Sequence, residues 1–223
     1  MFESVAVVGR GRVGMAVAAR LTERGICVHN RAERGTAGLV LFCVPDGAIG
    51  IEAASLSTGP WVAHVSGATP LAALAPHVHR FSVHPLQTFT RSRGAEQLDG
   101  AWGAVTAESG DARTRGLWLA ETLGLRPFEI DDQQRTQYHA GAAMASNFLV
   151  TLYRAASRLA AGAGAPPEAL IPLMQRTIEN GFELTGPIAR GDRATVDAHL
   201  SELRSHAPDL VEMYLALAKA TVP

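Results

Sequence analysis

Val5-Ala6-Val7-Val8-Gly9-Arg10-Gly11-Arg12-Val13-Gly14 is the stretch that decides the fold, because in it a short apolar run enters a G-x-G-x-x-G pattern. Apolar residues at helical spacing follow, from Met15 to Leu21. A strand that leads into this glycine pattern and then into a helix is typical of a dinucleotide-binding βα unit. The alternative is a glycine-rich turn that holds no ligand.

Each glycine of the pattern has a geometric role. Gly9 allows a tight turn, Gly11 lets the backbone approach a pyrophosphate, and Gly14 lets the helix pack closely on the strand. The first N–H groups of the helix have no partner within it and face the anion. The predicted cofactor contacts are Gly9, Arg10, Gly11, Arg12, Val13, Gly14, Asn30, Arg31, Val44, Pro45 and Ser66.

The composition excludes several classes of protein. With 223 residues, 47% of them hydrophobic, the chain can bury a large core. Its formal net charge of −1 predicts no general attraction to nucleic acid or to an anionic membrane surface. No basic segment precedes the first apolar run, and Gly9 interrupts that run, so we expect neither a signal peptide nor a membrane span. A cytoplasmic protein is therefore expected.

Short apolar runs alternate with helical patterns up to Ile130, which predicts an α/β fold with a mostly parallel sheet. Residues 30–39 leave too little chain for the usual crossover helix between the second and third strands, so this helix is expected to be missing or reduced to a turn. Residues 101–107 are expected to form an edge strand. The later patterns are helical, which predicts two domains, 1–131 with a Rossmann-type sheet and 132–223 all-helical.

The residues after the second strand are expected to determine which nicotinamide dinucleotide binds, NADP or NAD. Arg31 and Arg34 can hold the 2′-phosphate of NADP bidentately and with matched charge. Glu33 is the competing interpretation, because an acidic residue in this region binds the ribose hydroxyls of NAD. On charge, NADP is favoured over NAD. The alternative is that both arginines are solvated loop residues.

Two further turns lie at the carboxyl ends of predicted strands, where ligands bind in open α/β sheets. Val44-Pro45-Asp46 ends the third strand, and Ser66-Gly67 ends the next one. We expect both turns beside the nicotinamide or the substrate, with Ser66 as a hydroxyl donor or acceptor and Gly67 at the substrate. Each could instead be a strand–helix turn with a cap.

Two histidines are candidates for the proton transfer that accompanies hydride transfer. His84 ends a predicted strand, and His139 lies in a long predicted helix. At 3.6 residues per turn, Ser146 shares a helix face with His139 and Asn147 lies beside it, so both could orient a small polar substrate. The alternative is that each histidine is a hydrogen-bonded core residue.

Three smaller features complete the candidate residues. Arg190 lies in a rigid turn at 185–192 and could reach a substrate carboxylate or phosphate, whereas Asp192 is expected to cap the next helix. Cys27 and Cys43 lie in apolar runs and are expected to be buried, reduced thiols. No metal-ligand spacing stands out, so no metal is expected.

Motifs spread over most of the chain carry a family resemblance, at residues 7–14, 43–46, 65–68, 84–86, 138–140, 145–150 and 184–192. With them the chain resembles Rossmann-like proteins that carry a C-terminal helical domain of unknown function, within the phosphogluconate dehydrogenase-like superfamily. Related members are ketopantoate reductase, pyrroline-carboxylate reductase and the deazaflavin-dependent NADP oxidoreductases. The resemblance implies two domains and a homodimer formed through the helical half. It implies no particular substrate.

The chain departs from that superfamily at three places. Arg10 replaces the small residue that is usual between the first two glycines, and the helix after the second strand is cut short. The superfamily's hydroxyacid dehydrogenases carry a lysine four residues before an asparagine on the long helix, whereas Ala143 precedes Asn147 here. Without that lysine, His139 is the expected proton donor and His84 the second choice.

The predicted function is an NADP-dependent oxidoreductase that acts on a small polar carbonyl, hydroxyl or imine compound. The first alternative is a dinucleotide-binding sensor or regulatory protein without turnover. The second alternative is a structural dimer whose pocket has decayed.

Overall fold

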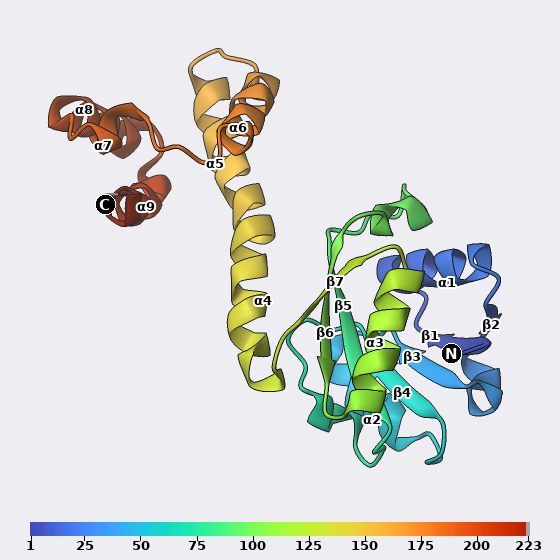
Figure 1. Ribbon diagram of the computed structural model, residues 1–223. Coiled ribbons are helices and arrows are strands. Elements are labelled where there is room, and N and C mark those ends of the chain that lie inside the picture. Colours follow the sequence, from blue (N-terminus) through green and yellow to red (C-terminus); the bar gives the residue numbers. More distant parts are fainter. Residues whose placement is uncertain (222–223) are drawn as a thin grey trace. The chain divides into compact units, whose positions relative to one another are not determined.

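The computed structural model describes residues 1–221, and its contacts divide the chain into two compact units (Figure 1). The first unit is Met1–Ser146, and the second begins at Asn147. The first unit therefore ends later than residue 131, where the domain boundary was predicted. It extends further because helix α4 (Arg135–Ala143) begins with Arg135, which is buried against the sheet. The predicted fold class, a mostly parallel sheet followed by helices, is confirmed.

One seven-stranded sheet organises the first unit, in the order β2-β1-β3-β4-β5-β6-β7. Neighbouring strands run parallel except β5 and β6, which are antiparallel. Because β2 and β3 lie on opposite sides of β1, the strand order reverses there. The strands are β1 (Ser4–Val8), β2 (Cys27–His29), β3 (Leu39–Phe42), β4 (Trp61–His64), β5 (Arg80–Leu86), β6 (Trp102–Ala107) and β7 (Arg126–Glu129).

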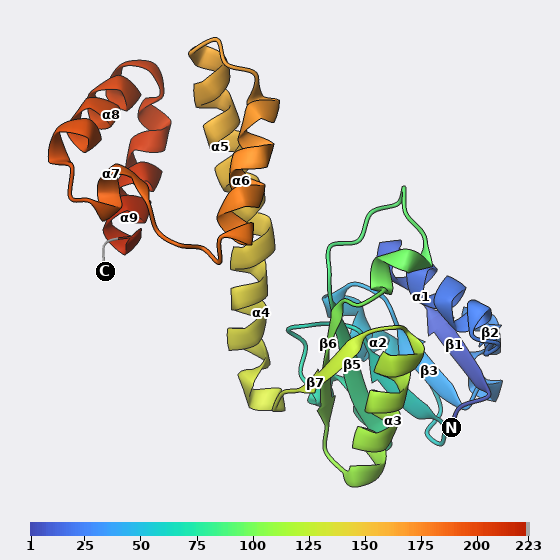
Figure 2. The same cartoon turned by 45° about the horizontal axis from the view of Figure 1, so that its top comes forward.

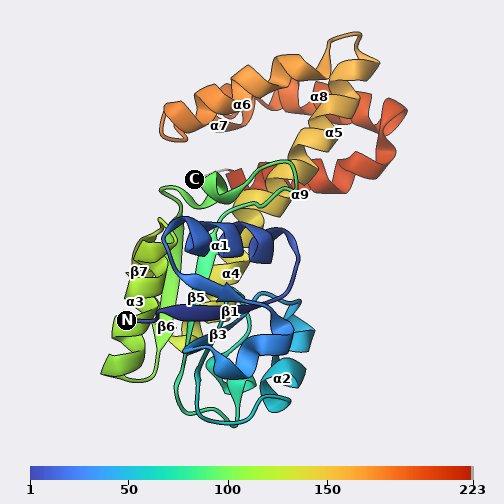
Figure 3. The ribbon, with the colours of Figure 1, turned by 90° about the vertical axis from the view of Figure 1, so that its right-hand side faces the viewer.

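Helices cover both faces of this sheet (Figure 3). On one face, α1 (Arg12–Glu23) and α3 (Gly110–Thr122) bury apolar side chains in a core with alternate residues of the strands. On the other face, α2 (Asp46–Ala54) and the 3₁₀ turn Leu71–Leu74 form a smaller core around Phe42. This layered packing holds the strand ends in place.

Two predictions about the connections have different outcomes. A short 3₁₀ turn, Arg31–Thr36, replaces the crossover helix between β2 and β3, as the chain length predicted. The prediction of an edge strand at 101–107 is wrong, because β7 pairs with the outer side of β6 and makes β6 an interior strand. Cys43 is buried as expected, but Cys27 is exposed because its strand, β2, lies at the edge of the sheet.

The second unit is helical throughout its regular structure (Figure 2). A π-helical turn, Met144–Phe148, carries the chain from α4 into α5, and Asp192 caps α8 by accepting from Thr195 N at 3.1 Å, as predicted. None of the helices over residues 1–221 has the length and apolar character that crossing a membrane requires. The helices of this unit are α5 (Leu149–Gly162), α6 (Leu170–Glu179), α7 (Gly186–Ala189), α8 (Arg193–His206) and α9 (Val211–Thr221).

Candidate functional site

The predicted site residues of the first unit gather at one edge of the sheet. The parallel strands β1, β3, β4 and β5 lie next to one another, so their carboxyl ends meet at this edge. The glycine loop follows β1, Val44-Pro45 follows β3, Ser66-Gly67 follows β4, and His84 lies near the end of β5. Ligands of open α/β sheets bind in this position, where the strand order reverses.

The three glycines of the loop have distinct surroundings. Gly9 has a φ of +123°, and a Cβ there would overlap the Cys43 carbonyl. A Cβ on Gly14 would overlap the Gly9 carbonyl, so the helix packs directly on the loop. By contrast, a Cβ on Gly11 would meet nothing within 4 Å. Two glycines therefore build the turn, and the third leaves open space at the N-terminus of α1.

A cavity of about 790 Å³ lies beside this loop. Val8 and Val44 give it apolar walls, and Gly9 and the exposed Arg10 border it on the loop side. Polar and charged residues line the side nearest β2: Asn30, Arg31, Arg34 and Glu52. An apolar wall with charged groups at one end suits a nucleoside that carries a phosphate.

The charged groups at the β2 end form ion pairs. Arg31 and Arg34 lie 2.6 and 2.9 Å from the two carboxylate oxygens of Glu52, and Arg34 also donates to Ser55 Oγ at 3.0 Å. Arg34 is largely buried, whereas the Arg31 side chain is 66% exposed. Glu33, the acid of the NAD interpretation, lies 3.7 Å from His29 Nδ1.

The remaining predicted cofactor residues lie around the same loop. Arg12 begins α1 and donates through Nη1 to the Phe89 carbonyl at 3.3 Å. Val13 is half-buried against the core, and Pro45 is the exposed residue that precedes α2.

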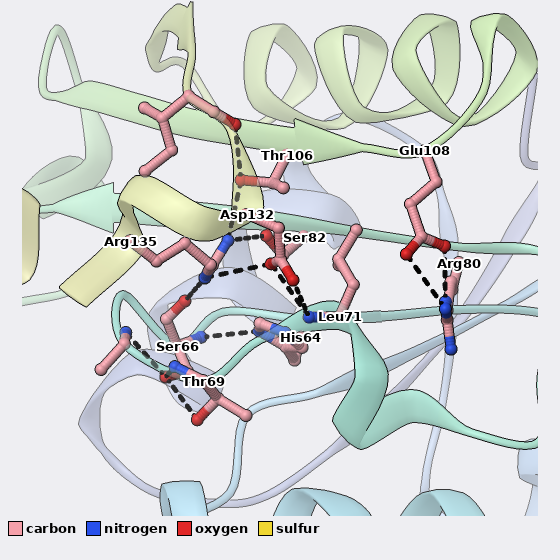
Figure 4. A network of polar contacts seen from close by, with 12 residues as sticks. His64, Ser66, Thr69, Leu71, Arg80, Ser82, Thr106, Glu108, Asp132 and Arg135 are labelled. Atoms are coloured by element: carbon pink, nitrogen blue, oxygen red, sulfur yellow. Dashed lines mark hydrogen bonds and ion pairs between the residues drawn. The ribbon is translucent and has the colours of Figure 1, made fainter.

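A buried cation lies under the neighbouring turn (Figure 4). Arg135 is 1% exposed and donates to Ser82 Oγ at 2.6 Å, to Thr106 Oγ1 at 2.8 Å and to the Ser66 carbonyl. An Asp132 carboxylate oxygen lies 3.8 Å from Arg135 Nε, and the same carboxylate accepts from Leu71 N at 3.0 Å. Burial lowers the pKa of Arg135. The guanidinium thus ties the start of α4 to β5, β6 and the Ser66-Gly67 turn.

Ser66 uses its hydroxyl to shape its own turn. Ser66 Oγ accepts from Thr69 N at 2.9 Å and from Ala68 N at 3.2 Å, and it donates to Thr69 Oγ1 at 2.9 Å. The Ser66 backbone N–H donates to Nδ1 of the buried His64 at 3.2 Å. The predicted contact of Ser66 with cofactor or substrate stays a prediction, and these bonds favour its backbone over its hydroxyl.

The two candidate histidines meet at Gly67. A Cβ on Gly67 would lie 2.6 Å from His139 Cδ2 and 2.9 Å from His84 Nε2, so both rings press against the turn. The two ring centroids are 6.0 Å apart. His84 Nδ1 lies 2.8 Å from the Tyr138 hydroxyl. The structure therefore brings Gly67, His84 and His139 together with Tyr138, and the predicted catalytic and substrate roles of these residues stay predictions.

Burial favours the neutral forms of both His84 and Tyr138. It lowers the pKa of His84 to about 4, with the nearby His139 and Arg135 acting in the same direction. It raises the pKa of Tyr138 to about 12. When the Tyr138 hydroxyl donates to Nδ1 of a neutral His84, the proton of the imidazole is on Nε2. His84 can then donate a hydrogen bond from Nε2 beside Gly67.

The other predicted substrate residues are placed less specifically. Ser146 donates to the Ala142 carbonyl at 2.8 Å, within the π-helical turn. The α-helical spacing that put Ser146 on the face of His139 does not hold across this turn, because a π-helix has more residues per turn. Asn147 begins the second unit, and Arg190 is an exposed residue at the end of α7. Their substrate roles stay predictions.

Sequence reasoning missed Arg135, Tyr138 and Glu52. Arg135, Tyr138, His139 and Ala142 have the i, i+3, i+4, i+7 spacing of one helix face, a signal that could have singled out the first two. No local pattern marks Glu52, which is paired through the tertiary structure. Over residues 1–221, no group of three or more His, Cys, Asp or Glu side chains could hold a metal ion.

Comparison with solved structures shows the same fold in several proteins. A Bacteroides fragilis protein provisionally named an NADP oxidoreductase superposes with a TM-score of 0.82 at 21% identity, covering 98% of this chain and 97% of its own. Protein TM1727 from Thermotoga maritima gives a TM-score of 0.76 at 22% identity, covering 97% and 96%. The 1-pyrroline-5-carboxylate reductase from Streptococcus pyogenes gives 0.62 at 14% identity, covering 98% and 96%. No curated protein sequence matches this chain.

A family model matches residues 102–221, more than half of the 223 residues. Its description is "Domain of unknown function (DUF2520)". The match runs from β6 through the helical unit, and the predicted resemblance to Rossmann-like proteins with such a helical domain is confirmed. The chain belongs to the DUF2520 family.

Proposed function

We propose that this protein is an oxidoreductase that uses a nicotinamide dinucleotide, NADP in preference to NAD, and acts on a small polar carbonyl, hydroxyl or imine compound. The observation that carries the proposal is the open space at Gly11, bounded by the free N-terminus of α1 and next to the cavity of about 790 Å³. The Bacteroides fragilis protein of the same fold, whose name includes NADP, supports the choice of cofactor.

The residues present fit such a cofactor. The backbone N–H groups of Arg12 and Val13 begin α1 and suit the pyrophosphate, because the helix start offers unpaired donors to an anion. Val8 and Val44 would contact the adenosine, and Arg10 and Arg31 would lie near its phosphates. When bound, the nicotinamide would supply or accept a hydride.

His84 and His139 would bind the substrate's oxygen or nitrogen atom and assist as it gains or loses a proton. Neutral His84 can donate a hydrogen bond from Nε2, which polarises a carbonyl while the ring itself stays neutral at pH 7. His139 lies against the same turn and is the proposed proton donor. The buried Arg135 holds the Ser66-Gly67 backbone on which both rings rest.

The test is a fluorescence titration of the purified protein with NADPH, using Gly11→Val as the variant. The introduced valine side chain enters space that is empty in the protein but is required by a pyrophosphate, so folding is kept and binding is lost. Gly110→Val is the matched control, because a Cβ there also meets nothing within 4 Å and Gly110 begins α3. Equal NADPH binding by wild type and Gly11→Val, or no binding by wild type at millimolar NADPH, would contradict the proposal.

We infer that copies of the chain pair through the helical unit. In the described part of this unit, residues 147–221, the buried hydrophobic side chains are Leu200, Leu203 and Ala207. Large apolar side chains on α5 and α6 stay exposed: Leu149, Val150, Leu152, Leu159, Ile171, Leu173 and Ile178. A second copy that brings the same helices would cover them.

A further inference from the structure

A single carboxylate, that of Glu52, pairs with both arginines at the β2 end of the cavity. Arg31 Nη2 lies 2.6 Å from Glu52 Oε1, and Arg34 Nη1 lies 2.9 Å from Glu52 Oε2. Each carboxylate oxygen serves one guanidinium. The three side chains together carry one net positive charge, so Glu52 cancels half of the charge that a 2′-phosphate would meet.

The two arginines are held to different degrees. Arg34 also donates to the Ser55 hydroxyl at 3.0 Å and to the Ser55 carbonyl at 3.4 Å, and its side chain is only 18% exposed. Arg34 thereby ties the 3₁₀ turn Arg31–Thr36 to the end of α2. The Arg31 side chain is 66% exposed, whereas that of its ion-pair partner Glu52 is largely buried. Arg34 is therefore fixed on two sides, whereas Arg31 is the arginine that a ligand can reach from solvent.

The Glu52 side chain is itself only 12% exposed and lines the cavity. A 2′-phosphate is a bidentate acceptor for arginine with up to two negative charges. At Arg31 it competes with the Glu52 carboxylate, whose negative charge lies close by. A ribose with a free 2′-hydroxyl carries no phosphate there and does not compete with the Glu52 carboxylate for Arg31.

We propose that Glu52 is a specificity-determining residue, which limits the preference of this site for the phosphorylated dinucleotide by competing for Arg31. The inference rests on the proposed function and deepens it. A repulsive or competing group is a usual device for setting a ratio of affinities without changing the shared contacts. The wild-type protein then discriminates only weakly between NADPH and NADH.

The experiment measures the dissociation constants of NADPH and NADH by fluorescence titration, for wild type, Glu52→Gln, Arg31→Gln and the double variant. Glu52→Gln is expected to raise the NADPH preference about tenfold or more, while NADH affinity stays within about twofold, since one charge-assisted contact is worth about this much. Arg31→Gln is expected to remove most of the preference. In the Arg31→Gln background, Glu52→Gln is expected to raise the preference clearly less than it does in wild type, because the two residues act on each other.

Glu108→Gln is the matched control, since Glu108 also pairs with an arginine, Arg80, at 2.8 and 3.0 Å on an exposed surface outside the cavity. It should leave both affinities unchanged. Glu52→Asp, which keeps the charge but shortens its reach, serves if Glu52→Gln does not fold, and it should give an intermediate preference. An unchanged ratio in Glu52→Gln, or additive effects in the double variant, would overturn this inference alone. A wild type that binds neither dinucleotide would overturn the proposed function together with it.

Discussion

At the scale of single residues, Gly67 decides how the two histidines meet the backbone. Its lack of a side chain lets His139 Cδ2 and His84 Nε2 approach to distances that a Cβ could not accept. The turn itself is held from two sides, by the Ser66 hydroxyl within it and by Arg135 beneath it. A small change at this residue therefore acts on the candidate chemistry more than on the fold.

Gly67→Ala is expected to push the rings of His84 and His139 off the turn. Their imidazole resonances in ¹H–¹⁵N spectra should shift, and turnover of a substrate, once found, should fall about 10²-fold or more if the rings handle its proton. Gly47→Ala is the control, because a Cβ there meets nothing within 4 Å. Unchanged histidine resonances in Gly67→Ala would show that the close approach has no consequence.

Two buried histidines predict how stability depends on pH. Burial lowers the pKa of His64 to about 3 and that of His84 to about 4, from 6.5. Below pH 6.5 the unfolded chain binds protons that the folded chain does not, so this stability is complete above pH 6.5 and is lost as the pH falls toward 4 and then 3. At pH 5 each histidine should cost on the order of 2 kcal/mol relative to pH 7, at 1.36 kcal/mol per pKa unit.

Urea unfolding at pH 7, 6 and 5 measures this loss. His64→Asn removes one titrating group and keeps an acceptor for Ser66 N, so it should flatten the decline between pH 6.5 and 5 by about half. An identical decline in wild type and variant would show that His64 does not titrate as the burial predicts.

At the scale of elements, α4 is attached to the sheet by one buried cation with its hydroxyl partners and by the Tyr138 ring, which packs edge-on against Phe128 of β7. The contacts of Arg135 are polar, and its partners Ser82 and Thr106 are fully or almost fully buried. Such a network is specific in geometry, because each acceptor has a fixed place. It is also sensitive, because a buried acceptor without its donor costs free energy.

Arg135→Met is expected to destabilise the protein by about 2–4 kcal/mol, because it leaves two hydroxyls and the Ser66 carbonyl without their donor. Arg113→Met is the control: Arg113 pairs bidentately with Glu129, but both side chains are about half exposed, so its loss should change stability little. Urea unfolding at pH 7 measures both. Equal stability losses in the two variants would show that the buried network does not anchor α4.

At the scale of the whole molecule, the two units differ in how much apolar surface they bury. The sheet unit has a continuous core on each face of the sheet, whereas the described helical unit buries few of its large side chains. The proposed pairing of copies would cover the apolar side chains that the helical unit leaves exposed.

Ile178→Glu on α6, where the wild-type side chain is 53% exposed, is expected to shift the protein from dimer to monomer. A charge in an interface that excludes water has to be desolvated without a partner, which opposes association. Light scattering coupled to size exclusion gives the molar mass. Ile51→Glu on α2 of the sheet unit, 71% exposed in the wild type, is the control and should leave the mass unchanged. A monomeric wild type at tens of micromolar would contradict the pairing.

The sequence by itself determined the opening βα unit and the reduced crossover at residues 31–36, and it placed Gly67 and His84 at the ends of neighbouring strands. These follow from local rules, because glycine sterics, chain length between strands and the common edge of parallel strands do not depend on distant partners. Only the tertiary structure decided the interior position of β6, the burial of Arg135 and the pairing of Arg31 with Glu52. Each of these depends on which surfaces meet in space. Nothing local in the sequence distinguishes Arg135 or Arg31 from a solvated arginine. Arg135 becomes a buried anchor, and Arg31 becomes an ion-pair partner of Glu52, only when folding brings their acceptors close.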